Sequence, residues 1–408
     1  MKCGLLGRKL SHSYSPQIHR MLGDYAYSLF EQEPENLEQF LKESEFSGIN
    51  VTIPYKKAVI PYLDEISPIA EKLGAVNTII RRSNGSLYGH NTDYFGFSTM
   101  LQQSGLSVSG KKVLVLGSGG ASNTVCAVLE ERKANIVVIS RNGADNYETI
   151  VHHTDAAVIV NATPVGMYPN TGISPVDLNL FPNLEGVLDL IYNPARTQIL
   201  LDAEKRGIVA VNGLLMLVAQ AKESAEYFLG HSISNAKIQE IHRKLATQMQ
   251  NLILIGMPGC GKSTIGKILA ESTGRIFRDA DAQIEELAGK SIPQIFAEDG
   301  EPVFRQWETE TLKQLGQQSG LVIATGGGCV IQMRNYFHLH QNGIILWIKR
   351  DLEQLPTDGR PLSLSGKLAD MYVFRKPLYA QFSDIVIDND STPKKTVDKI
   401  LKHLEGLQ

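Results

Sequence analysis

The chain has 408 residues, of which 43% are hydrophobic and 20% are charged. A compact domain usually has roughly 100–200 residues, so this length predicts two or three domains. The 40 basic and 43 acidic side chains give a net charge of −3, which excludes the strongly basic surface of a typical nucleic-acid or membrane-surface protein. We therefore expect small-molecule ligands.

No apolar run reaches the roughly 18 residues that a membrane-spanning helix needs, and the N-terminal apolar stretch soon meets Arg8 and Lys9. The four cysteines show no metal-ligand spacing and are too few for a disulfide framework. We expect a cytoplasmic protein with free thiols, and we make no prediction of its oligomeric state.

Short apolar strands alternate with helical patterns along the whole chain, which predicts an α/β fold with parallel sheets. Examples of these strands are residues 113–116, 136–139, 158–160 and 252–255. Two strands run directly into glycine loops, at residues 117–120 and 256–263, and each loop leads into a helix. We expect each of these strands to be the first strand of a separate nucleotide-binding sheet.

These patterns predict four segments. Residues 1–100 form an α/β substrate-binding lobe, residues 101–215 a Rossmann-like nucleotide-binding domain, residues 216–247 a helical segment that packs back on the lobe, and residues 248–408 a second nucleotide-binding domain with a parallel sheet.

The first glycine loop offers Gly117, Gly119 and Gly120, whose backbone N–H groups can bind a pyrophosphate at a helix N-terminus. Ser122 stands where the third glycine of the usual dinucleotide motif would be, so an ordinary tight turn is the alternative. The next strand ends at Ser140-Arg141 instead of at the acidic residue that binds a ribose hydroxyl. Arg141 favours a 2′-phosphate, hence NADP, unless it is a solvated loop charge.

In the first lobe, Ser15 is a candidate N-cap with Pro16 at the first helical position, and such a helix start can hold a carboxylate. Lys56 follows a strand that Pro54 ends, and Asp93 follows another apolar segment. An Asp–Lys pair beside a nicotinamide ring would be a proton donor with an orienting partner. Each of these residues could also be an ordinary solvated side chain.

Seven motifs in this part of the chain, taken together, closely resemble those of shikimate dehydrogenase. The resemblance covers roughly residues 1–245, and its motifs are residues 11–16, 50–56, 74–78, 91–93, 117–122, 161–167 and 212–221. It implies NADPH-dependent reduction of 3-dehydroshikimate to shikimate.

The resemblance also assigns roles to residues. It implies that Lys56 is the catalytic acid and that Asp93 orients it and balances its charge. Side chains that bind the substrate are Ser13, Ser15, Thr52, Asn77, Asp93 and Gln220. The NADP-binding residues are Gly117, Gly119, Gly120, Ala121, Arg141, Asn161, Thr163, Met167, Tyr192 and Gly213. The chain departs from the family where Tyr94 and Phe95 precede Gly96.

Residues 256–263 fit the P-loop motif G-x-x-x-x-G-K-[ST] in full, between an apolar strand and a helix. Gly259, Gly261 and Thr264 would help to bind ATP through this loop. Lys262 would reach the β- and γ-phosphates, and Ser263 would coordinate Mg²⁺. The loop predicts phosphoryl transfer without identifying the acceptor.

The rest of the chain resembles shikimate kinase across about residues 250–408. The residues that carry this resemblance are Asp279-Ala280-Asp281, Phe304-Arg305, Gly326-Gly327-Gly328, Arg360-Pro361-Leu362 and Arg375 to Tyr379. An adenine-stacking arginine that the family carries before Arg360 has no clear counterpart near Leu355 and Pro356.

The resemblance to the kinase implies that Asp281 contacts and deprotonates the acceptor hydroxyl and that Asp279 supports Mg²⁺ through water. It further implies that Arg305 and Arg375 hold the substrate carboxylate beside the three glycines. Arg360 would lie on a lid at residues 357–366, bind ATP and stabilise the phosphate that is transferred. For Arg305 and Glu308, an exposed pair one helical turn apart is the alternative.

The product of the first reaction would be the acceptor of the second, so the sequence predicts a bifunctional enzyme that uses NADPH, ATP and Mg²⁺. Two alternatives stay open: a first half that acts as a quinate/shikimate dehydrogenase, and a non-catalytic regulator that senses metabolites with the same domains.

Overall fold

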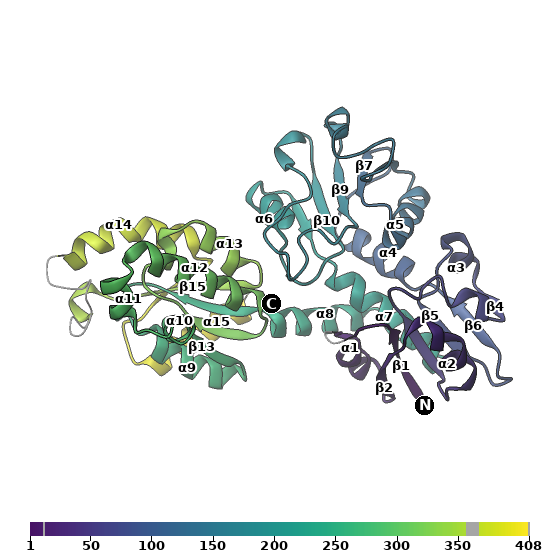
Figure 1. Cartoon of the computed structure of the whole chain (residues 1–408), viewed down its shortest axis with the longest axis horizontal. Helices are drawn as coiled ribbons and strands as arrows, with labels where there is room; N and C mark the ends of the chain where they lie inside the picture. Colours follow the sequence, from purple (N-terminus) through teal and green to yellow (C-terminus); the bar gives the residue numbers. More distant parts are fainter. Residues whose placement is uncertain (11–12, 356–366, 407–408) are drawn as a thin grey trace. The chain divides into compact units, whose positions relative to one another are not determined.

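The computed structural model describes residues 1–10, 13–355 and 367–406, and the chain divides into two compact units (Figure 1). Unit one comprises Met1–Val165, Ser174–Tyr192 and Ile199–Lys244. Unit two comprises Gly166–Ile173, Asn193–Gln198 and Leu245–Gln408. Among the helices described, none is long and apolar enough to cross a membrane.

The first sheet of unit one has six strands in the order β2-β1-β3-β5-β6-β4. The pairs formed by β5 with β3 and with β6 are antiparallel, and the other pairs are parallel. Its strands are β1 (Lys2–Gly7), β2 (Ala26–Glu31), β3 (Gly48–Val51), β4 (Glu65–Ile66), β5 (Thr78–Arg81) and β6 (Leu87–His90), and its helices are α1 (Ser15–Leu22), α2 (Leu37–Glu43) and α3 (Pro68–Leu73). Apolar residues of β3, β5 and α2 form the core of this lobe.

The second sheet of unit one is fully parallel, with the strand order β11-β10-β9-β7-β8. Its strands are β7 (Lys112–Leu116), β8 (Asn135–Ile139), β9 (Val158–Asn161), β10 (Gly186–Asp189) and β11 (Val209–Val211). Helices α4 (Asp93–Gln103) and α5 (Gly120–Glu131) lie on one face, and α6 (Gln198–Lys205) lies on the other (Figure 1). Because both faces are covered, the strands are continuous apolar runs without alternation.

Helix α7 (Leu214–Leu229) connects the two sheets of unit one, because it packs on α4 and also contacts α1, β3 and β5. It is followed by α8 (Ala236–Met249), and the division between the units falls after Lys244, inside this helix.

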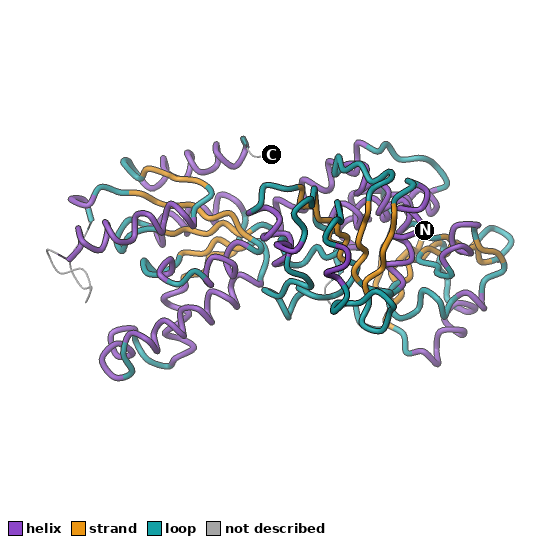
Figure 2. Tube along the Cα trace, turned by 90° about the horizontal axis from the view of Figure 1, so that it is seen from above, coloured by secondary structure: helices purple, strands orange, loops and turns teal. Residues whose placement is uncertain are grey.

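Unit two contains a five-stranded parallel sheet in the order β13-β14-β12-β15-β16, with helices on both sides (Figure 2). The strands are β12 (Asn251–Ile255), β13 (Ile276–Asp279), β14 (Leu321–Ala324), β15 (Gly343–Lys349) and β16 (Ile385–Asp388). The helices are α9 (Lys262–Thr273), α10 (Ala280–Ala288), α11 (Ile292–Glu298), α12 (Glu301–Gln317), α13 (Arg334–His340), α14 (Lys367–Phe382) and α15 (Pro393–Glu405). In this order β12 lies between β14 and β15. The connection after β12 runs to β13 on one side and the connection after β14 runs to β15 on the other, and ligands bind at such a switch point in open α/β sheets.

The predicted α/β fold class is confirmed: the second and third sheets are fully parallel, whereas β5 makes the first sheet mixed. One local prediction is wrong, because the N-cap of α1 is Tyr14 and Ser15 is already the first helical residue. The Oγ atom of Ser13 accepts a hydrogen bond from the backbone N–H of Ser15 at 3.2 Å. Ser13 thus holds the amide of the first helical residue, and the side chain of the N-cap residue Tyr14 does not cap α1.

Candidate active sites

In unit one, Lys56 and Asp93 form an ion pair. Lys56 lies in the turn after β3, and Asp93 is the first residue of α4. The Nζ atom of Lys56 donates to Oδ2 of Asp93 at 2.6 Å. The Asp93 side chain is 9% exposed and that of Lys56 is 30% exposed, so the ammonium is held by a buried carboxylate and still reaches solvent.

Asn77 fixes the other oxygen of Asp93. Its Nδ2 donates to Oδ1 of Asp93 at 3.0 Å and to Oε1 of Gln220 at 3.3 Å. Its Oδ1 accepts from the backbone N–H of Thr92 at 2.7 Å. Asn77 therefore connects the start of α4 with Gln220 on α7, and a buried amide with partners on both ends has one defined orientation.

These side chains line a cavity of about 210 Å³ in unit one. It brings together Ser13, Ser15, Thr52, Lys56, Asn77, Asp93, Tyr192 and Gln220, all of which we predicted, with Leu5, His19, Asn50, Val51, Leu217 and Ala221, which we did not name as site residues. Hydroxyl, amide and ammonium groups thus face one space, a lining that can hydrogen-bond the oxygen atoms of a small polar ligand.

Asn50 and His19 are the polar members of this cavity that sequence reasoning missed. The Tyr27 hydroxyl donates to Oδ1 of Asn50 at 2.8 Å. The His19 ring stacks on Tyr27 at 4.0 Å, and burial lowers the pKa of His19 to about 3, so this ring is neutral. A signal for Asn50 existed, because strand residues two apart share a face and Asn50 precedes Thr52 by two.

The first glycine loop meets the requirements of a dinucleotide site. Gly117 has a φ of 103°, and a Cβ there would lie 3.0 Å from Cγ2 of Thr163. Gly119 and Gly120 are exposed with open space around them, and no side chain caps the start of α5. Free N–H groups at an open helix start fit a pyrophosphate.

Other predicted NADP-binding residues lie at the ends of β8 and β9 and at the starts of α5 and α7. Asn161, at the end of β9, accepts from the Thr163 hydroxyl at 2.7 Å, whereas Ala121 and Arg141 are exposed at the start of α5 and after β8. Gly213 is the N-cap of α7, and a Cβ at this position would collide with the carbonyl of Leu190.

Tyr192 and Met167 fall into different units. Tyr192 lines the cavity of unit one and makes an edge contact with Tyr14 at 6.1 Å between ring centroids. Met167 is 45% exposed and belongs to unit two. Of these two predicted NADP-binding residues, only Tyr192 lines the cavity that holds Lys56.

In unit two, Lys262 is folded back on its own loop. Its Nζ donates to the backbone carbonyls of Gly256 at 2.9 Å and Met257 at 3.1 Å, and the residue is 8% exposed. Gly256, Gly259 and Gly261 have φ values of 143°, 83° and 100°, which only glycine adopts without strain. The loop is therefore wound around a buried ammonium, the arrangement that binds phosphates.

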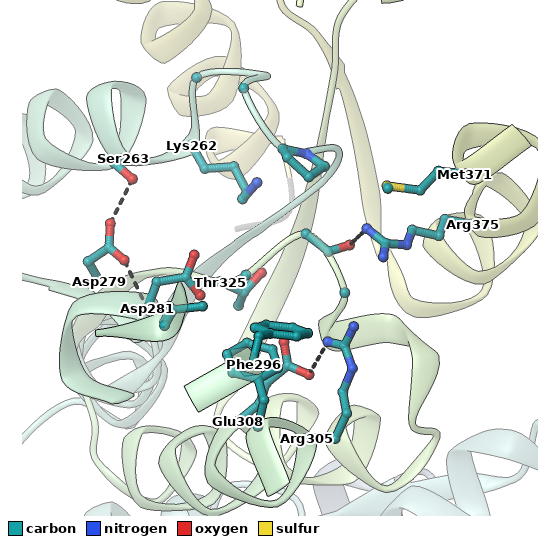
Figure 3. A pocket seen from close by; sticks show the side chains of 18 of the residues that line it. Lys262, Ser263, Asp279, Asp281, Phe296, Arg305, Glu308, Thr325, Met371 and Arg375 are labelled. Atoms are coloured by element: carbon teal, nitrogen blue, oxygen red, sulfur yellow. Dashed lines mark hydrogen bonds and ion pairs between the residues drawn. The ribbon is translucent and has the colours of Figure 1, made fainter. Parts of the chain in front are cut away.

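Ser263 and Asp279 lie side by side at the edge of the loop. The Ser263 hydroxyl donates to Oδ2 of Asp279 at 2.7 Å, and Oδ1 of Asp279 accepts from the Asp281 backbone N–H at 3.1 Å (Figure 3). A hydroxyl and a carboxylate are oxygen donors of the type that Mg²⁺ prefers. These two residues therefore fit a magnesium ion that keeps several water ligands.

The same cavity, of about 490 Å³, collects the predicted acceptor site. Predicted residues that line it are Gly259, Gly261, Lys262, Ser263, Thr264, Asp279, Asp281, Arg305, Gly326, Gly327, Gly328 and Arg375. A Cβ on Gly326 would lie 2.7 Å from Oδ1 of Asp281, so bare backbone is needed beside this carboxylate. Arg375 Nη1 donates to the carbonyl of Gly327 at 3.1 Å.

Arg305 and Glu308 form a buried pair, and the exposed-pair alternative is wrong. Arg305 Nη1 lies 2.9 Å from Oε2 of Glu308, and their side chains are 8% and 1% exposed. Burial raises the pKa of Glu308 against the opposing effect of Arg305, and Oε1 of Glu308 has no hydrogen-bond partner among the described residues. Burial thus disfavours the charged form of Glu308, and this carboxyl group contacts Arg305, which we predicted to bind the substrate.

Burial also raises the pKa of Asp281, and the charges of Asp279 and Glu285 act in the same direction. Lys262 and Arg305 oppose this shift. A carboxylate with a raised pKa is a stronger base than an exposed one, which suits proton abstraction from a hydroxyl.

Residues that line the same cavity but were not predicted as site residues are Ile292, Phe296, Phe304, Glu308, Thr325, Arg350 and Met371. Glu308 had a signal in its spacing from Arg305, whereas Arg350 simply follows β15. The predicted lid residue Arg360 lies outside the described residues.

The first part of the chain is similar to known proteins. A family model described as "Shikimate dehydrogenase substrate binding domain" matches residues 5–79. A shikimate dehydrogenase (NADP(+)) of Clostridium beijerinckii is 39% identical over 259 residues, which cover 59% of this chain and 96% of that protein. The chain belongs to the shikimate dehydrogenase family.

Two solved structures support the same assignment for the first part of the chain. Shikimate dehydrogenase 1 of Peptoclostridium difficile is 40% identical with a TM-score of 0.56, over 60% of this chain and 97% of that one. A chorismate mutase/shikimate 5-dehydrogenase fusion protein of Clostridium acetobutylicum is 39% identical with a TM-score of 0.58, over the same shares.

A second family model, described as "Shikimate kinase", matches residues 258–405. The chain thus joins a shikimate dehydrogenase to a shikimate kinase domain, and both predicted resemblances are confirmed.

Proposed function

We propose that the chain reduces 3-dehydroshikimate to shikimate with NADPH and then phosphorylates shikimate to shikimate 3-phosphate with ATP. The observation that carries this proposal is the Lys56–Asp93 contact at 2.6 Å inside a cavity lined by hydroxyl and amide groups. In the second cavity, Asp281 lines the same space as Arg305 and Arg375, which supports a role for Asp281 as the group that accepts the proton of the acceptor hydroxyl.

In the first reaction, a hydride adds to the ketone carbon and the electron pair of the carbonyl moves to its oxygen. The Lys56 ammonium stabilises this developing negative charge and gives the oxygen a proton, so the product is a neutral hydroxyl. Asp93 keeps the ammonium oriented. NADPH supplies the hydride when it is bound, and Lys56 regains its proton from solvent.

The choice of cofactor rests on the first glycine loop and on Arg141, which is exposed directly after β8. A guanidinium binds a phosphate dianion through two parallel hydrogen bonds, so Arg141 favours the 2′-phosphate of NADPH over the ribose hydroxyl of NADH. The curated relatives that carry NADP(+) in their name support this choice.

In the second reaction, Asp281 accepts the proton of the 3-hydroxyl, whose oxygen attacks the γ-phosphorus of ATP. The bond to the oxygen that bridges the β- and γ-phosphates breaks, and ADP leaves. Lys262 stabilises the charge on the phosphates, and Arg305 and Arg375 hold the substrate carboxylate. Ser263 and Asp279 would hold Mg²⁺, which supplies further charge neutralisation.

The decisive experiment follows the absorbance of NADPH after addition of 3-dehydroshikimate, then adds ATP and measures shikimate 3-phosphate by mass spectrometry. The proposal expects one NADPH consumed per dehydroshikimate and a phosphorylated product only after ATP. If quinate with NADP⁺ reacts faster than shikimate, the substrate of the first reaction is wrong. Ligand binding without turnover at either site would favour the regulator.

A further inference from the structure

Ser224 lies on α7 one turn after Gln220 and is fully buried. Its Oγ donates to the backbone carbonyl of Gln220 at 2.9 Å and accepts from Nδ2 of Asn50 at 2.7 Å. The hydroxyl oxygens of Thr78 and Thr92 each lie 3.0 Å from the same atom. One oxygen atom of α7 thus contacts side chains from three other parts of the lobe.

The protons of this cluster can be counted. A serine hydroxyl has one hydrogen and two lone pairs, so it can satisfy three of these four neighbours. The Asn50 amide is a donor and the Gln220 carbonyl is an acceptor, which leaves one lone pair of Ser224 for Thr78 or Thr92. Both threonine hydroxyls also reach Oδ1 of Asn77, at 3.1 and 3.2 Å.

Each residue that contacts Ser224 either lines the cavity or is adjacent in sequence to a residue that does. Asn50 lines the cavity itself, Thr78 follows Asn77, and Thr92 precedes Asp93. We propose that Ser224 is a positioning residue of the dehydrogenase, which sets the side-chain orientation of Asn50 directly and that of Asn77 through Thr78 and Thr92. This inference rests on the proposed dehydrogenase reaction.

The orientation of Asn50 depends most directly on Ser224. Its Nδ2 has two further acceptors, the Thr78 hydroxyl at 3.1 Å and the Asn77 carbonyl at 3.4 Å, and both are longer than the 2.7 Å contact with Ser224. Without the Ser224 hydroxyl, the Nδ2 group of Asn50 loses its shortest hydrogen bond. A buried donor that loses its acceptor costs free energy, and rotation of the Asn50 amide would relieve this cost. A turned amide would present different atoms to the substrate.

The test compares Ser224→Ala with the wild type in the full-length chain, in the direction from shikimate and NADP⁺. We expect the KM for shikimate to rise about tenfold, because one buried hydrogen bond that orients the substrate site is lost. The KM for NADP⁺ and the kinase activity of the same molecules should stay within twofold. Ser224→Thr, which keeps the hydroxyl, should restore most of the shikimate KM.

Two further variants separate positioning from simple destabilisation. Ser98→Ala, a matched exchange on α4 outside the cavity, should leave all parameters unchanged. Thr78→Val removes the hydroxyl that contacts Ser224 with little change in side-chain shape, and it should also raise the shikimate KM.

An unchanged shikimate KM in Ser224→Ala, or a rise shared by NADP⁺ and the kinase, overturns the inference. If Ser224→Ala does not fold, an unchanged shikimate KM in Thr78→Val overturns it. If the wild type does not oxidise shikimate, the proposed function fails first and the inference fails with it.

Discussion

The Nζ atom of Lys56 lies 2.6 Å from Oδ2 of Asp93, although 37 residues separate them in the sequence. The turn after β3 carries one partner and the first turn of α4 carries the other. This ion pair is the centre of the proposed reduction, because it provides both a proton and a group that orients its donor.

Lys56→Ala should lower the dehydrogenase kcat by about 10²–10⁴-fold, the usual contribution of a positioned general acid. Phosphorylation of added shikimate by the same protein should not change. Lys57→Ala is the matched control, because Lys57 is the next residue and is exposed. Equal kcat values for the Lys56 and Lys57 variants would show that Lys56 is not the acid.

Lys262→Ala should have the reciprocal effect. Its ammonium is the charge around which the P-loop folds, so its removal should abolish detectable shikimate phosphorylation and leave NADPH oxidation intact. Lys267→Ala, on the exposed face of the same helix, serves as the control. Retained phosphorylation in Lys262→Ala would contradict the kinase assignment.

Gly326→Ala tests the acceptor site without changing a charge. The added methyl group would lie 2.7 Å from Oδ1 of Asp281 and 3.1 Å from Oε1 of Glu308, so one of these carboxyl groups must move. We expect the kinase kcat to fall by at least tenfold while the affinity for ATP, measured by calorimetry, changes little. Wild-type kcat in this variant would show that Asp281 need not stay in place.

Arg350→Ala tests a residue that only the structure brought to the second cavity. Arg350 lines the cavity that holds the P-loop, and its Nε is buried without a hydrogen-bond partner among the described residues. An unpaired guanidinium is suited to a phosphate oxygen, so we expect the KM for ATP to rise about tenfold. The exposed Arg278 is the control, and an unchanged KM in the Arg350 variant would contradict this role.

Glu223 should make the stability of unit one depend on pH. Burial, assisted by the charge of Glu226, raises the pKa of Glu223 from 4.5 to about 8. Between these two values the folded state keeps a proton that the unfolded chain has released. The free energy of unfolding therefore falls as the pH rises from about 4.5 to about 8.

Glu223→Gln removes this titration, so the variant should gain thermal stability over the wild type at pH 8 and much less at pH 5. Melting curves of both proteins at the two pH values check this expectation, with Glu35→Gln at an exposed position as the control. A gain of the same size at both pH values would refute a raised pKa for Glu223.

The glycine loops and the strands before them could be predicted from sequence because their signals are local. Gly117 and Gly261 lie in loops directly after apolar strands, and the structure gives both a positive φ. The exact first residue of a helix is harder to predict from sequence. We predicted Ser15 as the N-cap of α1, and the structure has Tyr14 there, one residue earlier.

Side-chain contacts between distant segments could be predicted only where the family resemblance implied them. The pairing of Lys56 with Asp93 came with the family motif, whereas Ser224 and Asn50, 174 residues apart, carry no shared sequence signal. The spacing of Arg305 and Glu308 predicted a pair, but its burial depends on how α12 packs over the sheet. Burial is a property of the whole fold, and it determines both pKa shifts and access to substrate.

The most direct test of the bifunctional assignment is a single reaction of the full-length chain with 3-dehydroshikimate, NADPH, ATP and Mg²⁺, with its products measured over time. We expect NADPH oxidation and shikimate 3-phosphate formation to reach the same final amount, and shikimate to accumulate when ATP is left out. Oxidation without any phosphorylated product, or no oxidation at saturating substrate, would contradict the bifunctional assignment.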